Sequence, residues 1–262
     1  MKSLAAKPRS PALAAFVKSF HYHETNFPFT LERIMPNGQA HLMVSLAEDE
    51  FRTYDPARPE RTNRHSGAVL AGPHGRSTII DTRAQRWLVA VEFRSGGAAR
   101  FLSTPMSEFR DQIVSLEDAW GESGRSLRER LLAAPAPAAK FHVFEDLLLD
   151  HFKPGLDRGI EYAIEALRGG VPVSEVARRL GLLPRTLARR FSAEVGITPK
   201  RFARVQRLQR VLRAMRCTSQ PDWCTIAAEH GYTDQSHLIH DFRNLAHITP
   251  SGYKPHSPQR SN

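Results

Sequence analysis

The sequence carries one short pattern twice within its last hundred residues, and this duplication restricts the fold more than any other feature. The first copy begins at Val176-Ala177 and the second at Ile226-Ala227, fifty residues later. A glycine follows in each copy, at Gly181 and Gly231. The remaining matches are Leu187, Phe191 and Thr198-Pro199 in the first copy, and Leu238, Phe242 and Thr249-Pro250 in the second. Such self-similarity predicts two copies of one supersecondary unit.

Each copy has the pattern of a helix-turn-helix. A small alanine allows a second helix to cross closely, a glycine adopts the left-handed turn, and apolar residues then recur at helical spacing. In the first copy we expect Pro172 and Pro184 to begin the two helices. In the second copy we expect Asp222 and Thr233 to be the N-caps.

A single helix of about residues 199–216 is expected between the copies. At 1.5 Å per residue it would span roughly 27 Å. This length approaches the ~34 Å repeat of the DNA major groove. The spacing therefore favours two recognition helices that meet successive groove segments on one face of a duplex.

Charge is concentrated on the same stretch. Residues 178–216 contain twelve arginines or lysines and one acid, Glu194, in a chain of net charge +10. A basic surface attracts the phosphate backbone and drives affinity without choosing a sequence. A solvated arginine-rich face is the other interpretation, and the duplicated helix-turn-helix disfavours it.

The last hundred residues resemble the AraC/XylS family of bacterial transcription regulators. The residues that carry the resemblance are the two copies above, with Thr186, Arg190, Gly196-Ile197, Arg207-Leu208, Tyr232, Asp234-Gln235-Ser236-His237 and Tyr253. The resemblance implies two helix-turn-helix units, each of which inserts its second helix into the major groove of double-stranded DNA. It also implies that the protein, if it activates transcription, contacts RNA polymerase.

Positions matched to the family give the candidate DNA contacts. The base-contact candidates are Arg185, Thr186, Ala188, Arg189, Gln235, Ser236, Ile239 and His240. The phosphate-contact candidates are Arg190, Lys200, Arg201, Arg204, His237 and Arg243. Arginine suits a guanine edge and glutamine an adenine edge, whereas Ala188 and Ile239 could touch only a thymine methyl. Three residues depart from the family pattern: Leu183 replaces a capping serine, His240 an arginine and His247 a glycine.

The amino-terminal half is expected to be rich in β-strands. Residues 42–44 and 87–93 are the clearest strand segments, and residues 36–38 form a turn. The polar stretch 49–65 is expected to be a mobile loop. Helices are expected at 98–102, 106–109, 127–134 and 138–152. Residues 111–120 are expected to form a connecting segment.

We therefore predict an α+β chain: a β-rich domain, barrel or sandwich-like, with flanking helices, and an all-α domain of two helix-turn-helix units joined by a linking helix. The expected boundaries are 1–152 for the first domain, 153–156 for the linker, 157–256 for the DNA-binding domain and 257–262 for a disordered tail. The first domain also resembles the β-rich sensing domain of one AraC-family branch, in residues 36–38, 91–98 and 116–120. This implies control by a small-molecule effector or by self-association as a homodimer.

The other class of function is a metal-dependent, cupin-like enzyme that carries a basic helical domain. His21 and His23 would point to one side of a strand, and with His41 they could hold a metal. Satisfied histidines are the competing interpretation, and spacing places no fourth ligand. Cys217 and Cys224 lack the spacing of a zinc site, and no phosphate loop or nucleophile elbow occurs.

A methyl-transferring repair protein would need a reactive cysteine in the first half, which has none. An interaction module without a DNA role is the third alternative. With 41% hydrophobic residues, no signal peptide and no apolar run long enough for a membrane span, the chain is expected to be a cytoplasmic globular protein. We expect a DNA-binding transcription regulator that is not an enzyme, has no cofactor and has no membrane partner.

Overall fold

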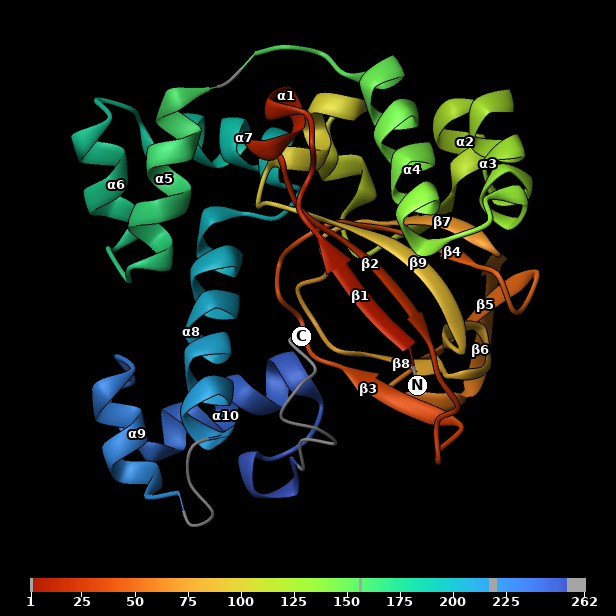
Figure 1. The fold of residues 1–262 in the computed structure, drawn as a ribbon. Helices are drawn as coiled ribbons and strands as arrows, with labels where there is room; N and C mark the ends of the chain where they lie inside the picture. The colour runs from red at the N-terminus through yellow and green to blue at the C-terminus, as the bar shows by residue number, and fades with distance from the viewer. Residues whose placement is uncertain (1, 156, 217–220, 254–262) are drawn as a thin grey trace.

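The computed structural model describes residues 2–155, 157–216 and 221–253 (Figure 1). Below, residues 2–152 are the β-rich part and residues 157–253 the helical part. The expected tail 257–262 and Cys217 lie outside the described residues, as do position 156 of the expected linker and the end of the expected DNA-binding domain.

The β-rich part contains two antiparallel sheets. The six-stranded sheet has the order β1-β2-β9-β4-β7-β10, and the four-stranded sheet the order β3-β8-β5-β6. The strands of the first sheet are β1 (Lys2–Ala6), β2 (Val17–Glu24), β9 (Trp87–Phe93), β4 (His41–Ser45), β7 (Ala68–Ala71) and β10 (Ile113–Ser115). Those of the second are β3 (Leu31–Ile34), β8 (Thr78–Asp81), β5 (Glu50–Asp55) and β6 (Arg58–Ser66).

The six-stranded sheet is buried on both faces at its central strand β9. On β9, Val89, Val91 and Phe93 belong to the main core with the helices, whereas Leu88 packs with Phe51 of β5 on the other side. Side chains alternate between the faces of a strand. A strand covered on both sides therefore has a near-continuous run of apolar residues, as at 87–93.

Helices cover one face of this sheet (Figure 1). They are α2 (Leu116–Trp120), α3 (Glu122–Ala133) and α4 (Pro137–His151). Phe20 of β2 stacks on Phe141 and Phe144 of α4, with ring centroids 5.8 and 6.5 Å apart. Each buried phenylalanine contributes about 1.5–3 kcal/mol. Short helical turns complete the part: α1 (Pro11–Ala14), η1 (Arg83–Gln85), η2 (Gly97–Phe101) and η3 (Met106–Phe109).

The expected loop over residues 49–65 is wrong, because this stretch is the β5–β6 hairpin. Glu50 pairs with Ser66 and Tyr54 with Thr62. Strand β6 is the outer strand of its sheet and is exposed along almost its whole length, so its side chains are polar although its backbone is paired. Similarly, the expected connection 111–120 contains strand β10 and helix α2.

The helical part contains the two expected units at opposite ends of helix α8 (Pro199–Arg216), as Figure 1 shows. The first unit is α6 (Val173–Arg179) and α7 (Pro184–Val195), preceded by α5 (Arg158–Arg168). The second is α9 (Trp223–Glu229) and α10 (Gln235–Ala246), followed by η4 (Pro250–Gly252). We call α8 the linking helix. No helix in the described ranges is both long and apolar enough to cross a membrane.

Most of the expected helix ends are confirmed. Gly181 and Gly231 both have positive φ, 63° and 74°, at the turns. The Asp222 side chain accepts from the Cys224 amide and caps α9. The prediction for Thr233 is wrong, since Asp234 is the N-cap of α10 and accepts from the His237 amide at 2.7 Å. The carboxylate one residue further on satisfies the free amide of the first turn.

Candidate nucleic-acid interface

Helix α7 is the first candidate recognition helix. Pro184 occupies its first turn, Leu187, Phe191 and Val195 face the core, and Gly196 ends it with φ 88°. Arg185 and Arg189 are exposed on the opposite side, whereas Thr186 and Ala188 are half-buried. The two arginines therefore lie away from the packed stripe, whereas Ala188, seven residues before Val195, lies at its edge.

Helix α10 is the second candidate. Leu238, Phe242 and Leu245 are buried, while Ser236 and His240 are exposed. Gln235 and Ile239 are half-buried, and the Cys224 thiol donates to Gln235 Oε1 at 3.5 Å. The side chain of Ile239 also packs against the core of the second unit.

The six phosphate-contact candidates fall into two groups. Lys200, His237 and Arg243 are exposed. The ring of His237 lies edge-on to Tyr232, with centroids 5.2 Å apart, and accepts from the Thr233 amide at 3.3 Å. The other three, Arg190, Arg201 and Arg204, have internal contacts.

Arg190 forms an ion pair with Asp157, whose side chain also caps α5. The two charged groups lie 2.6 Å apart. Burial alone would raise the pKa of Asp157, but the Arg190 guanidinium and the amides of Ile160 and Gly159 outweigh it and lower that pKa. Arg190 thus ties α7 to the start of the helical part. Its role at a phosphate stays a prediction.

Arg204 on the linking helix donates to the buried carboxylate of Asp241 on α10. The hydroxyl of Tyr232 donates to the other oxygen of Asp241 at 3.3 Å. Burial, and then the charge of Asp241, raise the pKa of Tyr232, so the phenol stays a donor. A buried carboxylate therefore links the second recognition helix to the linking helix.

Arg201 is half-buried beside Gly75 of the β-rich part. Burial lowers its pKa, and the neighbouring charges of Arg76 and Arg204 add to the effect. Desolvation of a cation costs free energy when no anion lies beside it. A phosphate bound at Arg201 would offset that cost. The contact stays a prediction.

The metal candidates do not form a cluster. His21 contacts Ser19 and lies 3.4 Å from Glu92. His41 contacts Asn37 at 3.2 Å, and His23 lies edge-on to Phe27. In the described ranges no group of three histidine, cysteine or acidic side chains could hold a metal ion.

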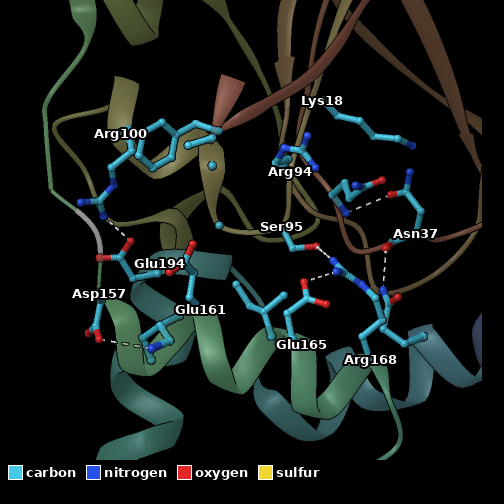
Figure 2. A pocket seen from close by; sticks show the side chains of 18 of the residues that line it. Lys18, Asn37, Arg94, Ser95, Arg100, Asp157, Glu161, Glu165, Arg168 and Glu194 are labelled. Carbon is cyan, nitrogen blue, oxygen red and sulfur yellow. Dashed lines mark hydrogen bonds and ion pairs between the residues drawn. The ribbon is translucent and has the colours of Figure 1, made fainter. Parts of the chain in front are cut away.

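A cavity of about 350 Å³ lies between the β-rich and helical parts (Figure 2). Its wall from the β-rich part includes Lys18, Arg94 and Arg100, and its wall from the helical part includes four acids: Asp157, Glu161, Glu165 and Glu194. Arg168 of α5 lies in the same wall, donates to Ser95 at 3.2 Å and pairs with Glu165. Arg100 pairs with Glu194 on α7 and donates to the Gly155 carbonyl at 3.0 Å. The cavity therefore adjoins contacts that reach the first recognition helix.

Sequence reasoning missed Asp157 and Asp241, the two acids that hold arginines of the helical part. Asp157 stands at the N-cap of α5, a position that the sequence could have indicated, whereas Asp241 lies inside α10, where no local pattern marks a buried carboxylate. Their partners lie 33 and 37 residues away, so only the tertiary fold identifies the pairs.

Comparison with known proteins gives two family matches. Residues 176–255 match a family model described as a helix-turn-helix domain. Residues 7–115 match a domain of unknown function, DUF6597. The curated proteins contain no significant match.

Among solved structures, the fold is similar to that of ToxT from Vibrio cholerae. One ToxT structure shares 8% identity over 97% of this chain and 98% of that chain, with a TM-score of 0.45. A ToxT structure from strain O395 bound to (E)-4-(8-methylnaphthalen-1-yl)but-3-enoic acid shares 12% identity over 97% and 98%, with a TM-score of 0.46. Wild-type ToxT from strain SCE256 bound to an unsaturated fatty acid shares 11% over 96% and 92%, with a TM-score of 0.41.

The family match spans both units and the linking helix, whose turns, caps and buried stripes follow the pattern of the sequence. Residues 176–255 are therefore an AraC-type helix-turn-helix domain, and the protein that carries them is a DNA-binding transcription regulator.

Proposed function

We propose that the protein recognises a two-part DNA sequence by inserting α7 and α10 into adjacent segments of the major groove. The observation that carries this proposal is the pair of similar helices, each with polar side chains exposed opposite its buried stripe, at the two ends of an 18-residue helix. That helix spans roughly 27 Å, which suits successive turns of one duplex face.

The two helices would differ in what they recognise. On α7, Arg185 and Arg189 can each donate two hydrogen bonds to a guanine edge, and Ala188 can contact a thymine methyl. On α10, Gln235 matches an adenine edge, whereas Ser236 and His240 discriminate less. We expect the first unit to contribute more of the base selectivity. Lys200, His237 and Arg243 would hold the flanking phosphates.

We further propose that a small polar effector controls DNA binding from the cavity between the two parts. Cations of one part face acids of the other there, and Arg100 joins that wall to Glu194 of α7. A bound molecule that competes for either partner would alter how α7 is held. We propose two further steps of regulation: self-association of the protein through its β-rich part, and a contact with RNA polymerase.

The test of DNA recognition is selection of binding sites from random duplexes by the purified full chain, followed by affinity measurements against salt concentration. We expect a two-part motif and a log–log salt slope of about −0.9 per phosphate neutralised. Failure to enrich any sequence at moderate salt would contradict the proposal. Bound metal at one equivalent, without DNA affinity, would favour the cupin-like enzyme instead.

The test of effector control is a panel of polar metabolites added during DNA binding. We expect at least one compound to shift the DNA affinity of the wild type and to lose that effect in Arg94→Ala, which removes one cation from the cavity wall. If no compound acts, or if one acts equally on the variant, the cavity is not the control site.

A further inference from the structure

The end of β3 and the connection from it to β4 together contact both helix-turn-helix units. We call residues Arg33–Gln39 the bridging segment. It belongs to the β-rich part, yet its neighbours lie about 160 to 210 positions later in the chain. No contact of this kind was expected from the sequence, which predicts only a turn at residues 36–38.

One end of the bridging segment reaches into the second unit. Met35 is 1% exposed and belongs to the same apolar cluster as Leu208 and Leu212 of the linking helix and Leu238 and Phe242 of α10. This methionine therefore completes the core of the unit that holds the second recognition helix. A residue of the β-rich part is thus packed inside the DNA-binding part.

The backbone end of α10 is held from the same side. Arg33 donates to the Ala246 carbonyl at 3.2 Å, and the Ser77 hydroxyl donates to that carbonyl at 2.8 Å. The Ser77 amide donates to the Leu245 carbonyl at 2.7 Å. The last carbonyls of a helix have no partners within it, so the β-rich part supplies them for α10.

The middle of the bridging segment lies along the linking helix. Gln206 donates from Nε2 to the Asn37 carbonyl at 3.1 Å, and Gln209 donates to the Pro36 carbonyl at 2.8 Å. These two glutamines are three residues apart, so they lie on one face of α8. The bridging segment therefore covers the face of α8 that carries Gln206 and Gln209.

The other end lies against the first unit. Gly38 has φ 71°, and a Cβ built on it would lie 3.3 Å from Ile197 and 3.6 Å from both Phe202 and Val205. Ile197 and Phe202 belong to the core of the first unit, with Leu187 and Phe191 of α7. Within four residues, from Met35 to Gly38, the chain passes from one unit's core to the other's.

We infer that the bridging segment fixes the separation and the relative angle of the two recognition helices, and thereby the spacing of half-sites that the regulator accepts. This inference rests on the proposed two-part DNA recognition. Rotation of either unit about the linking helix would withdraw Met35 from the second core or separate Gly38 from the first. Both units must match the helical phase of the duplex at once, so a rigid connection selects one spacing. Met35, Gln206 and Gln209 are positioning residues, since none of them is expected to touch DNA.

The experiment uses the full chain and the duplex that the wild type itself selects from a random pool. Half-site preferences and the spacing between half-sites are determined for the wild type, for Met35→Ala and for the double variant Gln206→Ala/Gln209→Ala. The double variant removes two polar contacts and no core volume, so it stays informative if Met35→Ala folds poorly. Met43→Ala is the matched control, because Met43 packs against the core between the two sheets of the β-rich part.

We expect the wild type and Met43→Ala to select one spacing and to lose about tenfold in affinity when one base pair is inserted between the half-sites. Both bridging variants should keep the same base preferences and accept a range of spacings, so that the insertion costs them less than about threefold. A wild-type spacing penalty in both variants would overturn the inference while leaving two-part recognition intact. Selection by the wild type of a one-part motif, or of none, would overturn the proposed function and the inference together.

Discussion

Nε of Arg204 lies 2.7 Å from Oδ1 of Asp241, so the linking helix and the second recognition helix share an ion pair whose acid is almost fully buried. The pair joins the linking helix to α10, two of the elements through which we propose that the protein binds DNA. An arginine expected at the phosphate backbone is therefore tied to a carboxylate within its own domain.

We expect Arg204→Ala to destabilise the protein, because it leaves a buried carboxylate without its cation. Removal of one partner from a buried pair costs several kcal/mol. Since the Arg204 side chain is 30% exposed, we expect roughly 2–4 kcal/mol in urea unfolding. The double variant Arg204→Ala/Asp241→Asn should recover part of this loss, because an amide carries no charge. An unchanged free energy of unfolding with a salt slope lowered by about one would instead identify Arg204 as a phosphate contact.

Arg189 offers the sharpest test of base recognition. It is exposed on the outer face of α7, and a two-bond contact with guanine is worth about 1–3 kcal/mol. Arg189→Ala should lose this affinity on the selected duplex and lose its preference at one base position, as measured by competition with point-substituted duplexes. Arg130→Ala, which removes an exposed arginine from α3 of the β-rich part, is the control and should change neither. An equal loss on every duplex would assign Arg189 to the backbone.

Two glycines of the first unit should respond differently to alanine. Gly181 and Gly196 both have positive φ, 63° and 88°, where a Cβ costs about 1–2 kcal/mol. Around Gly181 a Cβ would meet nothing within 4 Å, whereas at Gly196 it would lie 2.3 Å from Pro73 and 2.9 Å from the Met106 carbonyl. We expect Gly181→Ala to show the backbone cost alone in urea unfolding and Gly196→Ala to lose clearly more, because the β-rich part must move. Equal losses would show that the parts do not pack at Gly196.

The helix-turn-helix units could be predicted because their signals are local. A glycine turn, a proline in the first turn and an apolar stripe each act within a few residues, and Pro184 and Gly181 lie where the pattern predicts. The prediction that Thr233 caps α10 was wrong because its neighbour Asp234 adopts the extended conformation that an N-cap requires.

The features that sequence reasoning missed depend on distant partners. Strand β6 has no apolar alternation, since its side chains are exposed and only its pairing with β5 makes it a strand. Met35 follows an ordinary strand and precedes a predicted turn, and its packing partners on α10 lie some 200 residues away. No periodicity within the bridging segment could indicate that it completes another domain's core.

The start of α7 can be improved. Leu183 stands at its N-cap with extended backbone, makes no side-chain capping bond and is 75% exposed. A serine there can accept from the free amides of the first turn, which contributes about 0.5–2 kcal/mol. We expect Leu183→Ser to raise the free energy of unfolding by this amount and Leu183→Ala, which cannot cap, to leave it nearly unchanged. If the two variants behave alike, the first turn gains nothing from a cap.

The stability of the β-rich part should fall in mild acid because of His41. Burial lowers the pKa of His41 from its ordinary 6.5 to about 4, although the Glu92 carboxylate opposes the shift. The folded state therefore holds a neutral ring, which accepts from Asn37 Nδ2 at 3.2 Å, whereas the unfolded chain takes up a proton below about pH 6.5. Since the unfolded state binds more protons, stability is full above pH 6.5 and is lost as the pH falls toward 4.

The loss from His41 should reach at most about 3.5 kcal/mol, since a pKa difference of one between the folded and unfolded states is worth about 1.4 kcal/mol. Urea unfolding of the full chain at pH 7, 5.5 and 4 measures it. A Trp223→Phe background leaves Trp87 on β9 and Trp120 on α2 as the fluorescent probes, both of them in the β-rich part. His41→Gln, which does not titrate, should be less stable than the wild type at pH 7 and should lose less stability on acidification. A pH dependence as steep in His41→Gln as in the wild type would contradict the assignment and would move the acid sensitivity to other groups of the β-rich part.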